Sequence, residues 1–314
     1  MLPHRFFRVA SVLAITCGVL VGTVACDRNP PAARGDSVSM NPESASSAEA
    51  IAADRSGWIR SAGPALLIQG ETRDEAIVLF PRDDDSAAAD QLGLLGNQGA
   101  GVTLFGRGGA RLTAQLGLPP QTLDTECRVW PLRSVRGDNV ENTWAIGFAG
   151  GQVGPMALDS IDALSSGDSL ALTAEASRLA STVTATTAPA FQGLRFTAHD
   201  IHRFELLPGV QAIVVHLTRK VNQEANPQEE QTLLIAERDS GVTTGPYQLV
   251  YAERTHGLEE TMTTPEIIAG VRIAGRPMLI VARDGNEGVA YALLERTGPR
   301  QWRIRWTSGL TRCG

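Results

Sequence analysis

Apolar and polar residues alternate most regularly in the second half of the chain. Within residues 211–220, Ile213, Val215 and Leu217 occupy every second position, which is the period of a β-strand. Residues 302–306 alternate in the same way, with two tryptophans and an isoleucine on one side and two arginines on the other. Each segment predicts a strand with one face in the core and the other in water.

Shorter apolar runs in the first half also predict strands. Residues 75–80, 102–105 and 143–148 are rich in β-branched or aromatic side chains, and Gly, Asp and Asn residues surround them. Between residues 169 and 183 the period changes, because Leu172, Ala176, Leu179, Ala180 and Val183 share one helical face. An amphipathic helix capped by Asp168 or Ser169 is expected there.

Two segments of the second half follow similar patterns. Residues 204–254 read FELLPG, AIVVHLTR, LLIAER and YQLVYAER, and residues 271–306 read VRIAG, PMLIVAR, YALLER and QWRIRW. The pairs Glu237-Arg238 and Glu295-Arg296 occupy matching places in the two series. Each segment predicts a meander of about four antiparallel strands, and the similarity suggests an internal repeat.

These patterns predict a mainly β protein, with antiparallel meanders in stacked sheets or a propeller-like arrangement and one or two amphipathic helices near the middle. We expect a signal peptide at 1–25, a flexible tether at 26–54, a β-rich region at 55–165, a helical connector at 166–188 and a β-meander region at 189–314. Composition supports the tether, because residues 27–53 are rich in Ser, Ala, Pro and Glu and have few large apolar side chains.

The first residues have the layout of a secretory signal peptide. His4, Arg5 and Arg8 precede an uncharged apolar run at 9–21. The stretch Thr23-Val24-Ala25-Cys26 resembles the lipobox of bacterial lipoproteins, with Thr23 where leucine is usual. This resemblance covers residues 1–26 only. It implies an exported envelope protein that faces the periplasm or the cell surface, anchored to a membrane by acyl chains such as palmitate on Cys26. An ordinary cleavage site beside an unmodified cysteine is the alternative.

Charge argues against nucleic acid as a partner. The chain has 28 basic and 34 acidic residues and a net charge of −6. Loss of Arg5 and Arg8 with the signal peptide would bring the mature chain to −8, whereas phosphate backbones attract clustered positive charge.

Two of the four cysteines remain once the signal peptide is removed and Cys26 is lipidated. In an exported protein, Cys127 and Cys313 are then expected to form a disulfide bond. Free thiols that bind a metal or carry out redox chemistry are the alternative, but the C-x-x-C spacing is absent.

His199, Asp200 and His202 form the best candidate metal site, because imidazole and carboxylate ligands close in sequence can share one ion. On a regular strand, positions three apart point to opposite faces, so the two histidines need a turn to converge. His216 or His256 would have to complete the site. Histidines that are solvated or hydrogen-bonded are the alternative.

Oxygen-rich segments at 83–85 and 222–230 are possible Ca²⁺ ligands, although the second lacks both the glycine and the final glutamate of a calcium loop. Glycines between 96 and 109 are better explained by hairpin turns than by a phosphate cradle, because no Lys-Ser/Thr pair follows them. The sequence has neither a G-x-S-x-G nor an H-E-x-x-H motif.

Without a catalytic constellation, a non-enzymatic binding or accessory module is the favoured function. Its expected partners are the membrane, through the anchor, and an envelope protein or glycan. No cofactor is indicated. An exported hydrolase with a carboxylate-based site is one alternative, and a calcium-stabilised β protein is another.

Overall fold

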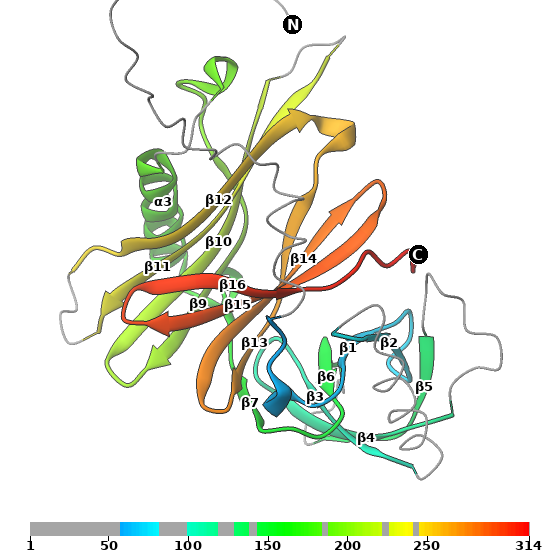
Figure 1. Ribbon diagram of the computed structural model, residues 1–314. Coiled ribbons are helices and arrows are strands. Elements are labelled where there is room, and N and C mark those ends of the chain that lie inside the picture. Colours follow the sequence, from blue (N-terminus) through cyan, green and yellow to red (C-terminus); the bar gives the residue numbers. More distant parts are fainter. Residues whose placement is uncertain are drawn as a thin grey trace, which may run out of the picture. The chain divides into compact units, whose positions relative to one another are not determined.

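The computed structural model describes residues 57–81, 99–118, 129–137, 143–183, 188–221, 226–240 and 245–313. All of them belong to one compact unit of the chain. The described part is mainly β, with antiparallel sheets and one α-helix, as the sequence predicts (Figure 1). The predicted signal peptide and tether lie outside the described residues.

Six antiparallel strands close into a barrel in the order β1-β2-β5-β4-β3-β6. Leu66 of β1 pairs with Leu79 of β2 on one side and with Phe148 of β6 on the other, which completes the circle. The expected strands at 75–80, 102–105 and 143–148 correspond to β2, β3 and β6. The bounds are β1 (Leu66–Gln69), β2 (Glu75–Leu79), β3 (Gly101–Phe105), β4 (Arg111–Leu116), β5 (Val129–Gly137) and β6 (Ile146–Phe148).

The second half forms two five-stranded sheets with the same topology. Sheet 1 has the order β12-β11-β10-β9-β8, and sheet 2 has the order β16-β15-β14-β13-β7. The two segments that resemble each other in sequence thus become equivalent four-stranded meanders. Their bounds are β9 (Thr197–Leu207), β10 (Val210–Val221), β11 (Gln228–Asp239), β12 (Gln248–Leu258), β13 (Thr264–Ile273), β14 (Arg276–Gly285), β15 (Gly288–Gly298) and β16 (Gln301–Thr307).

A short segment before the helix adds one edge strand to each sheet. β7 (Val153–Met156) pairs with β13 of sheet 2, and β8 (Asp159–Ser160) pairs with β9 of sheet 1. The approach to β13 is close, because a Cβ on Gly270 would lie 2.8 Å from the Met156 carbonyl oxygen. Both edge strands come from the expected N-terminal region 55–165, so that region also contributes to the two C-terminal sheets.

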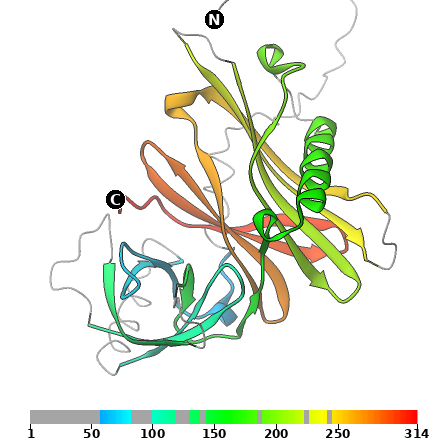
Figure 2. The ribbon, with the colours of Figure 1, turned by 180° about the vertical axis from the view of Figure 1, so that it is seen from behind.

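The helix α3 (Ser166–Thr182) lies along one face of sheet 1 (Figure 2). It begins three residues earlier than predicted because Ser165 caps it, with its Oγ 3.2 Å from the Asp168 backbone nitrogen. Four of its five expected apolar positions are buried, and Val183 is the C-cap. Single-turn 3-10 helices are η2 (Arg60–Ala62), η3 (Ile161–Ala163), η4 (Pro189–Phe191) and η5 (Glu259–Thr261). Within the described ranges, no helix is long and apolar enough to cross a bilayer.

Sheet 2 has apolar contacts on both faces. Val271, Ile280 and Trp306 belong to a buried cluster with Leu66 and Phe148 of the barrel. On the opposite face, apolar side chains of β13 to β16 meet those of sheet 1. This second cluster includes Leu279, Val281 and Leu294 of sheet 2 with Val214, Leu233 and Ile235 of sheet 1. Alternate positions of the same strands therefore support two different packing interfaces.

An ion pair lies inside the contact between the two sheets. Glu237 of β11 accepts from Arg296 of β15, with Nε at 2.9 Å from Oε1 and Nη2 at 2.8 Å from Oε2. The indole nitrogen of Trp302 donates to the same Oε1 at 2.7 Å. The side chains of Glu237 and Arg296 are only 2% and 9% exposed. Each charge thus depends on the other for its compensation.

The variant Glu237→Gln tests this dependence. It keeps the size of the side chain but leaves the Arg296 guanidinium buried without a counter-charge, so the free energy of unfolding should fall by about 3 kcal/mol. Asp239→Asn is the matched control, because the Asp239–Arg300 pair on the same strand is exposed and is expected to contribute less than about 1 kcal/mol. Urea unfolding followed by tryptophan fluorescence measures both. Equal losses in the two variants would refute the argument.

Candidate functional site

A β-bulge determines where the three predicted metal ligands of β9 lie. The pairing between β9 and β10 shifts at His199, because His216 pairs with Asp200 and Leu217 with Ala198. The shift brings the His199 ring onto the face of His216, with ring centroids 5.2 Å apart and Nε2 2.6 Å from Thr218 Oγ1. The expectation that residues three apart point to opposite faces fails here because of the bulge.

The other two predicted ligands contact each other. His202 Nε2 lies 2.8 Å from Asp200 Oδ1, while the His199 ring engages Thr218 and His216 instead. No group of three or more His, Cys, Asp or Glu side chains arranged for a metal is found in the described part of the chain. The metal site at His199, Asp200 and His202 stays a prediction that these contacts do not support.

Of the two segments predicted as possible calcium sites, the structure describes only part of the second. Asp83 to Asp85 lie outside the described residues. In the segment 222–230, Glu229 and Glu230 belong to β11 and form ion pairs with Lys220 at 3.3 Å and Arg219 at 2.7 Å. These two carboxylates already have cationic partners within the fold.

Of the predicted cysteine pair, only Cys313 is described. It packs against the cluster between the barrel and sheet 2. Cys127 and Cys26 both lie outside the described residues. The specific pairing of Cys127 with Cys313 therefore stays a prediction.

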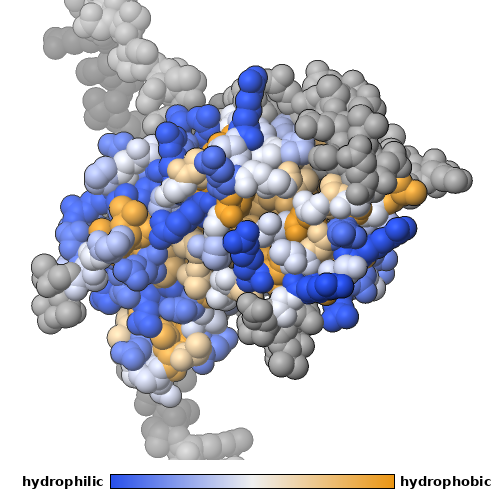
Figure 3. Space-filling view, turned by 90° about the horizontal axis from the view of Figure 1, so that it is seen from below, coloured by the Kyte–Doolittle hydropathy of each residue, from blue (hydrophilic) through white to orange (hydrophobic). Residues whose placement is uncertain are grey.

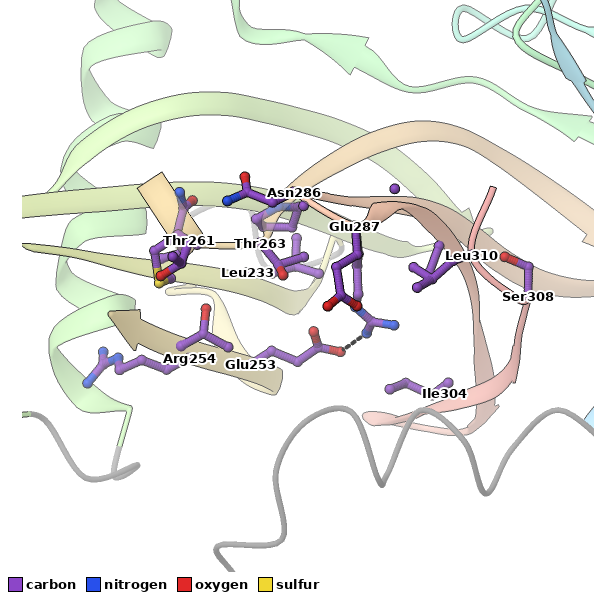
Figure 4. A pocket seen from close by; sticks show the side chains of 18 of the residues that line it. Leu233, Glu253, Arg254, Thr261, Thr263, Asn286, Glu287, Ile304, Ser308 and Leu310 are labelled. Atoms are coloured by element: carbon purple, nitrogen blue, oxygen red, sulfur yellow. Dashed lines mark hydrogen bonds and ion pairs between the residues drawn. The ribbon is translucent and has the colours of Figure 1, made fainter. Parts of the chain in front are cut away.

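A cavity of about 850 Å³ lies between the edge of sheet 1 and the end of sheet 2 (Figure 4). β11 and β12 line one side, β14, β15 and β16 line the other, and the segments around Thr263 and Leu310 complete the wall. Its lining is mixed. Apolar contributions come from Leu233, Met262, Pro265, Ala290, Ile304 and Leu310, and polar ones include Gln231, Tyr251, Glu253, Arg283, Glu287 and Ser308.

Three polar side chains meet in one wall of this cavity. Glu253 Oε1 accepts from Arg283 Nη2 at 2.5 Å and from the Tyr251 hydroxyl. Burial, and then the nearby charge of Glu253, raises the pKa of Tyr251, so the phenol stays protonated and donates. The Arg283 side chain is only 8% exposed, and its Nη1 has no hydrogen-bond partner among the described residues. The cluster thus keeps a buried donor unused beside a cavity.

Two carboxylates line the same cavity as that donor. Glu253 is partly exposed and makes its described bonds through Oε1 alone. The exposed Glu287, from the β14–β15 turn, extends toward Glu253 (Figure 4). This wall can therefore offer an acceptor, Glu253 Oε2, to a ligand, and a small shift of the buried Arg283 side chain toward the cavity would add a donor, Nη1.

The cavity adjoins the histidine cluster through Gln231. The Gln231 side chain lines the cavity, hydrogen-bonds to His216 through Oε1, and has its Nε2 3.2 Å from Glu229 Oε1. The structure thus places His216 next to His199, as a completed metal site would require. The His216 ring, however, is hydrogen-bonded to the side-chain amide of Gln231.

Exposed apolar side chains do not indicate another site. In the described part, large apolar residues left exposed lie on separate elements: Leu118, Leu170, Leu194, Leu258 and Leu310. Figure 3 shows apolar residues on one face as patches interrupted by polar side chains. Of the exposed residues, Leu310 also lines the cavity, which makes the cavity the stronger candidate for binding.

The sequence did not reveal the residues of the cavity wall. Tyr251 and Glu253 lie in the segment YQLVYAER and Arg283 ends the segment PMLIVAR, and the pattern of both segments predicts only strands. The available signal was a charged residue at the end of each apolar run. No family model matches the chain, and no curated protein or solved structure is significantly similar to it.

Burial of His216 predicts how stability depends on pH. Burial is the main cause that lowers its pKa below the ordinary value of 6.5, and the charge of His199 acts in the same direction; the hydrogen bond to Gln231 and the charge of Asp200 oppose them. As the pH falls below about 6.5, the unfolded chain takes up this proton before the folded one does, so stability is lost.

Between pH 7 and pH 5, we expect the free energy of unfolding to fall less for His216→Gln than for the wild type. The difference between the two falls should be at most about 1.4 kcal/mol for each pH unit. Chemical unfolding at pH 5, 6 and 7 measures this difference. His256→Gln, which replaces an exposed histidine, controls for the loss of one imidazole. Parallel pH dependences of the wild type and His216→Gln would contradict the prediction.

Proposed function

We propose that the chain is an exported protein of the cell envelope, anchored to a membrane through lipidated Cys26, that binds a neutral ligand of the glycan type in the cavity between the two sheets. The anchor rests on the signal-like residues 1–26 and the tether composition of 27–53. The binding site rests on the hydrogen-bonded cluster of Tyr251, Glu253 and Arg283 in the cavity wall.

The cavity wall matches the chemistry of a hydroxyl-bearing ligand. A hydroxyl group both donates and accepts, so one or two neighbouring hydroxyls can donate to Glu253 Oε2 and, once the Arg283 side chain shifts toward the cavity, accept from its Nη1. A buried donor without a partner costs about 1–3 kcal/mol, which a ligand acceptor would recover. Apolar surface at Ile304 and Leu310 would face the C–H groups of the same ligand.

Charge favours a neutral ligand over an ionic one. Arg283 and Glu253 compensate each other, and the two other charged side chains of the lining, Arg254 and Glu287, have opposite signs. The four charges balance, so the lining has no net charge that would favour an ionic ligand.

A hydrolase is the second candidate, because Glu253 and Glu287 both line the cavity. Paired carboxylates are the usual groups of glycoside hydrolases. Binding is favoured because Glu253 Oε1 already accepts from Tyr251 and Arg283. Incubation of the protein with a bound glycan, followed by mass analysis of the products, distinguishes the two functions.

Intact mass spectrometry of the membrane-extracted protein tests the anchor. We expect a chain that begins at Cys26 and carries acyl groups. Thiol labelling before and after reduction should modify Cys127 and Cys313 only after reduction, because both are expected to form one disulfide. An unacylated chain, or labelling of Cys127 without reduction, would contradict the respective part of the proposal.

A cavity-filling variant tests the ligand site without breaking the ion pair. Thr263 lines the cavity and is exposed, so Thr263→Trp should block the cavity while the melting temperature stays unchanged. The matched control is Thr297→Trp, at an exposed position of β15 that does not line this cavity. Calorimetry with a neutral N-acetylglucosamine trimer should show at least about tenfold weaker binding for Thr263→Trp alone, equivalent to about 1.4 kcal/mol.

Charge selectivity is measured in the same assay with trigalacturonic acid, an anionic trisaccharide, which should bind more weakly than the neutral trimer. Failure of every saccharide to bind the wild type would refute the glycan proposal, and equal binding by Thr263→Trp would remove the cavity from it.

A further inference from the structure

A group of arginines surrounds one buried glutamate on sheet 2, apart from the cavity. Glu295 of β15 pairs with Met278 of β14 and with Arg303 of β16. Arg276 begins β14, two positions before Met278. Side chains at these paired or alternate positions share one face of the sheet, so Arg276, Glu295 and Arg303 project from the same side.

Glu295 binds the arginines through both carboxylate oxygens. Arg276 Nη1 lies 2.9 Å from Oε1, and Arg303 Nη2 lies 3.4 Å from Oε2. Arg305 Nε approaches Oε2 to 3.9 Å, but this nitrogen is buried and has no hydrogen-bond partner among the described residues. One carboxylate therefore hydrogen-bonds to two guanidinium groups and lies within 4 Å of a third.

The cluster has an excess of positive charge that solvent can reach. Three guanidinium groups around one carboxylate leave two positive charges uncompensated within the cluster, in a chain whose net charge is −6. The Glu295 side chain is 1% exposed, whereas those of Arg276, Arg303 and Arg305 are 68%, 56% and 34% exposed. The negative charge is thus buried, while all three arginines are at least partly accessible to solvent.

The remaining donors suit an oxyanion with several acceptor oxygens. Each guanidinium carries five N–H donors in a planar fork, and Glu295 engages only part of them. A carboxylate beneath the arginines restricts their rotation, so less side-chain entropy is lost when an anion binds. The geometry supports a preorganised site more than three independent surface arginines.

We propose that Arg276, Arg303 and Arg305, held by Glu295, form a binding site for a phosphate or phosphate-ester dianion. The charge of a phosphate ester at neutral pH, about −1.5 to −2, balances the two excess positive charges of the cluster. The phosphate oxygens can accept hydrogen bonds from more than one guanidinium group. A monocarboxylate neutralises only half of that excess. The phosphate group can belong to a free anion or to the headgroup of an envelope lipid or glycan, and both present the same oxygens.

Calorimetry on the purified mature protein in neutral detergent tests the proposal at low ionic strength, where screening is weak. The probes are inorganic phosphate, glycerol 3-phosphate and acetate. We expect both phosphates to bind, acetate to bind at least about tenfold more weakly, and added salt to weaken the binding. Stronger binding of glycerol 3-phosphate than of inorganic phosphate identifies a headgroup as the source, and the reverse order identifies the free anion.

Arg303→Gln is the decisive variant and should weaken phosphate binding at least about tenfold, because a charge-assisted hydrogen bond is lost. Arg300→Gln is the matched control. Arg300 is also exposed, lies on the adjacent turn and is ion-paired with Asp239 outside the cluster, so its loss should leave binding within about twofold. Arg276→Gln provides a second variant if Arg303→Gln fails to fold, which melting temperatures reveal.

Several results would overturn the proposal. Wild-type protein that binds neither phosphate would exclude the site. Equal affinity for acetate would exclude selection of a dianion. Equal weakening by Arg300→Gln and Arg303→Gln would show a general effect of surface charge. The cavity variant Thr263→Trp should bind phosphate normally, so failure of the cavity proposal and failure of this one are distinguishable.

Discussion

Sheet 2 is buried on both faces, and the rest of the described structure is arranged around this constraint. Residues 277–283 of β14 form seven consecutive buried positions. Met278 and Ile280 face the barrel, while Leu279 and Val281 face sheet 1. A shift of one residue in register would exchange the two sets and place each against the wrong neighbour. The barrel and sheet 1 must therefore each present an apolar face to this sheet.

This arrangement explains why residues 277–283 of β14 are buried without interruption, whereas the edge strands β12 and β16 have half-buried or exposed positions. A strand covered on both sides has no position that faces water, as in the buried sheets of α/β proteins. β12, at the edge of sheet 1, has mostly half-buried residues instead. That edge is where polar side chains such as Glu253 can approach the interior without losing all contact with solvent. The cavity thus lies where the double burial of sheet 2 ends.

Local periods are sufficient to predict the helix, the strands of the two meanders and the barrel strands β2, β3 and β6. They did not lead to a prediction of β1, β4, β5, β7 or β8. The sequence also indicated the equivalent meanders, since 204–254 and 271–306 have apolar runs of similar length and order. Closure of the barrel was not predictable, because it depends on pairings between distant segments such as Leu66 with Phe148. The cavity wall was missed for the same reason. Glu253 and Arg283 are 30 residues apart and meet only because two sheets pack face to face.

Two of the ion pairs between sheets 1 and 2 differ in how completely their hydrogen-bonding groups are satisfied. Glu237 has both oxygens occupied by Arg296, and Trp302 adds a further hydrogen bond. The pair of Glu253 and Arg283 has similar chemistry but leaves Arg283 Nη1 without a partner in the described structure. A partly satisfied buried network is less stable than an apolar surface of the same shape. An incomplete pair in the wall of a cavity is therefore poorly explained by stability alone, and a ligand that supplies the missing acceptor explains it better.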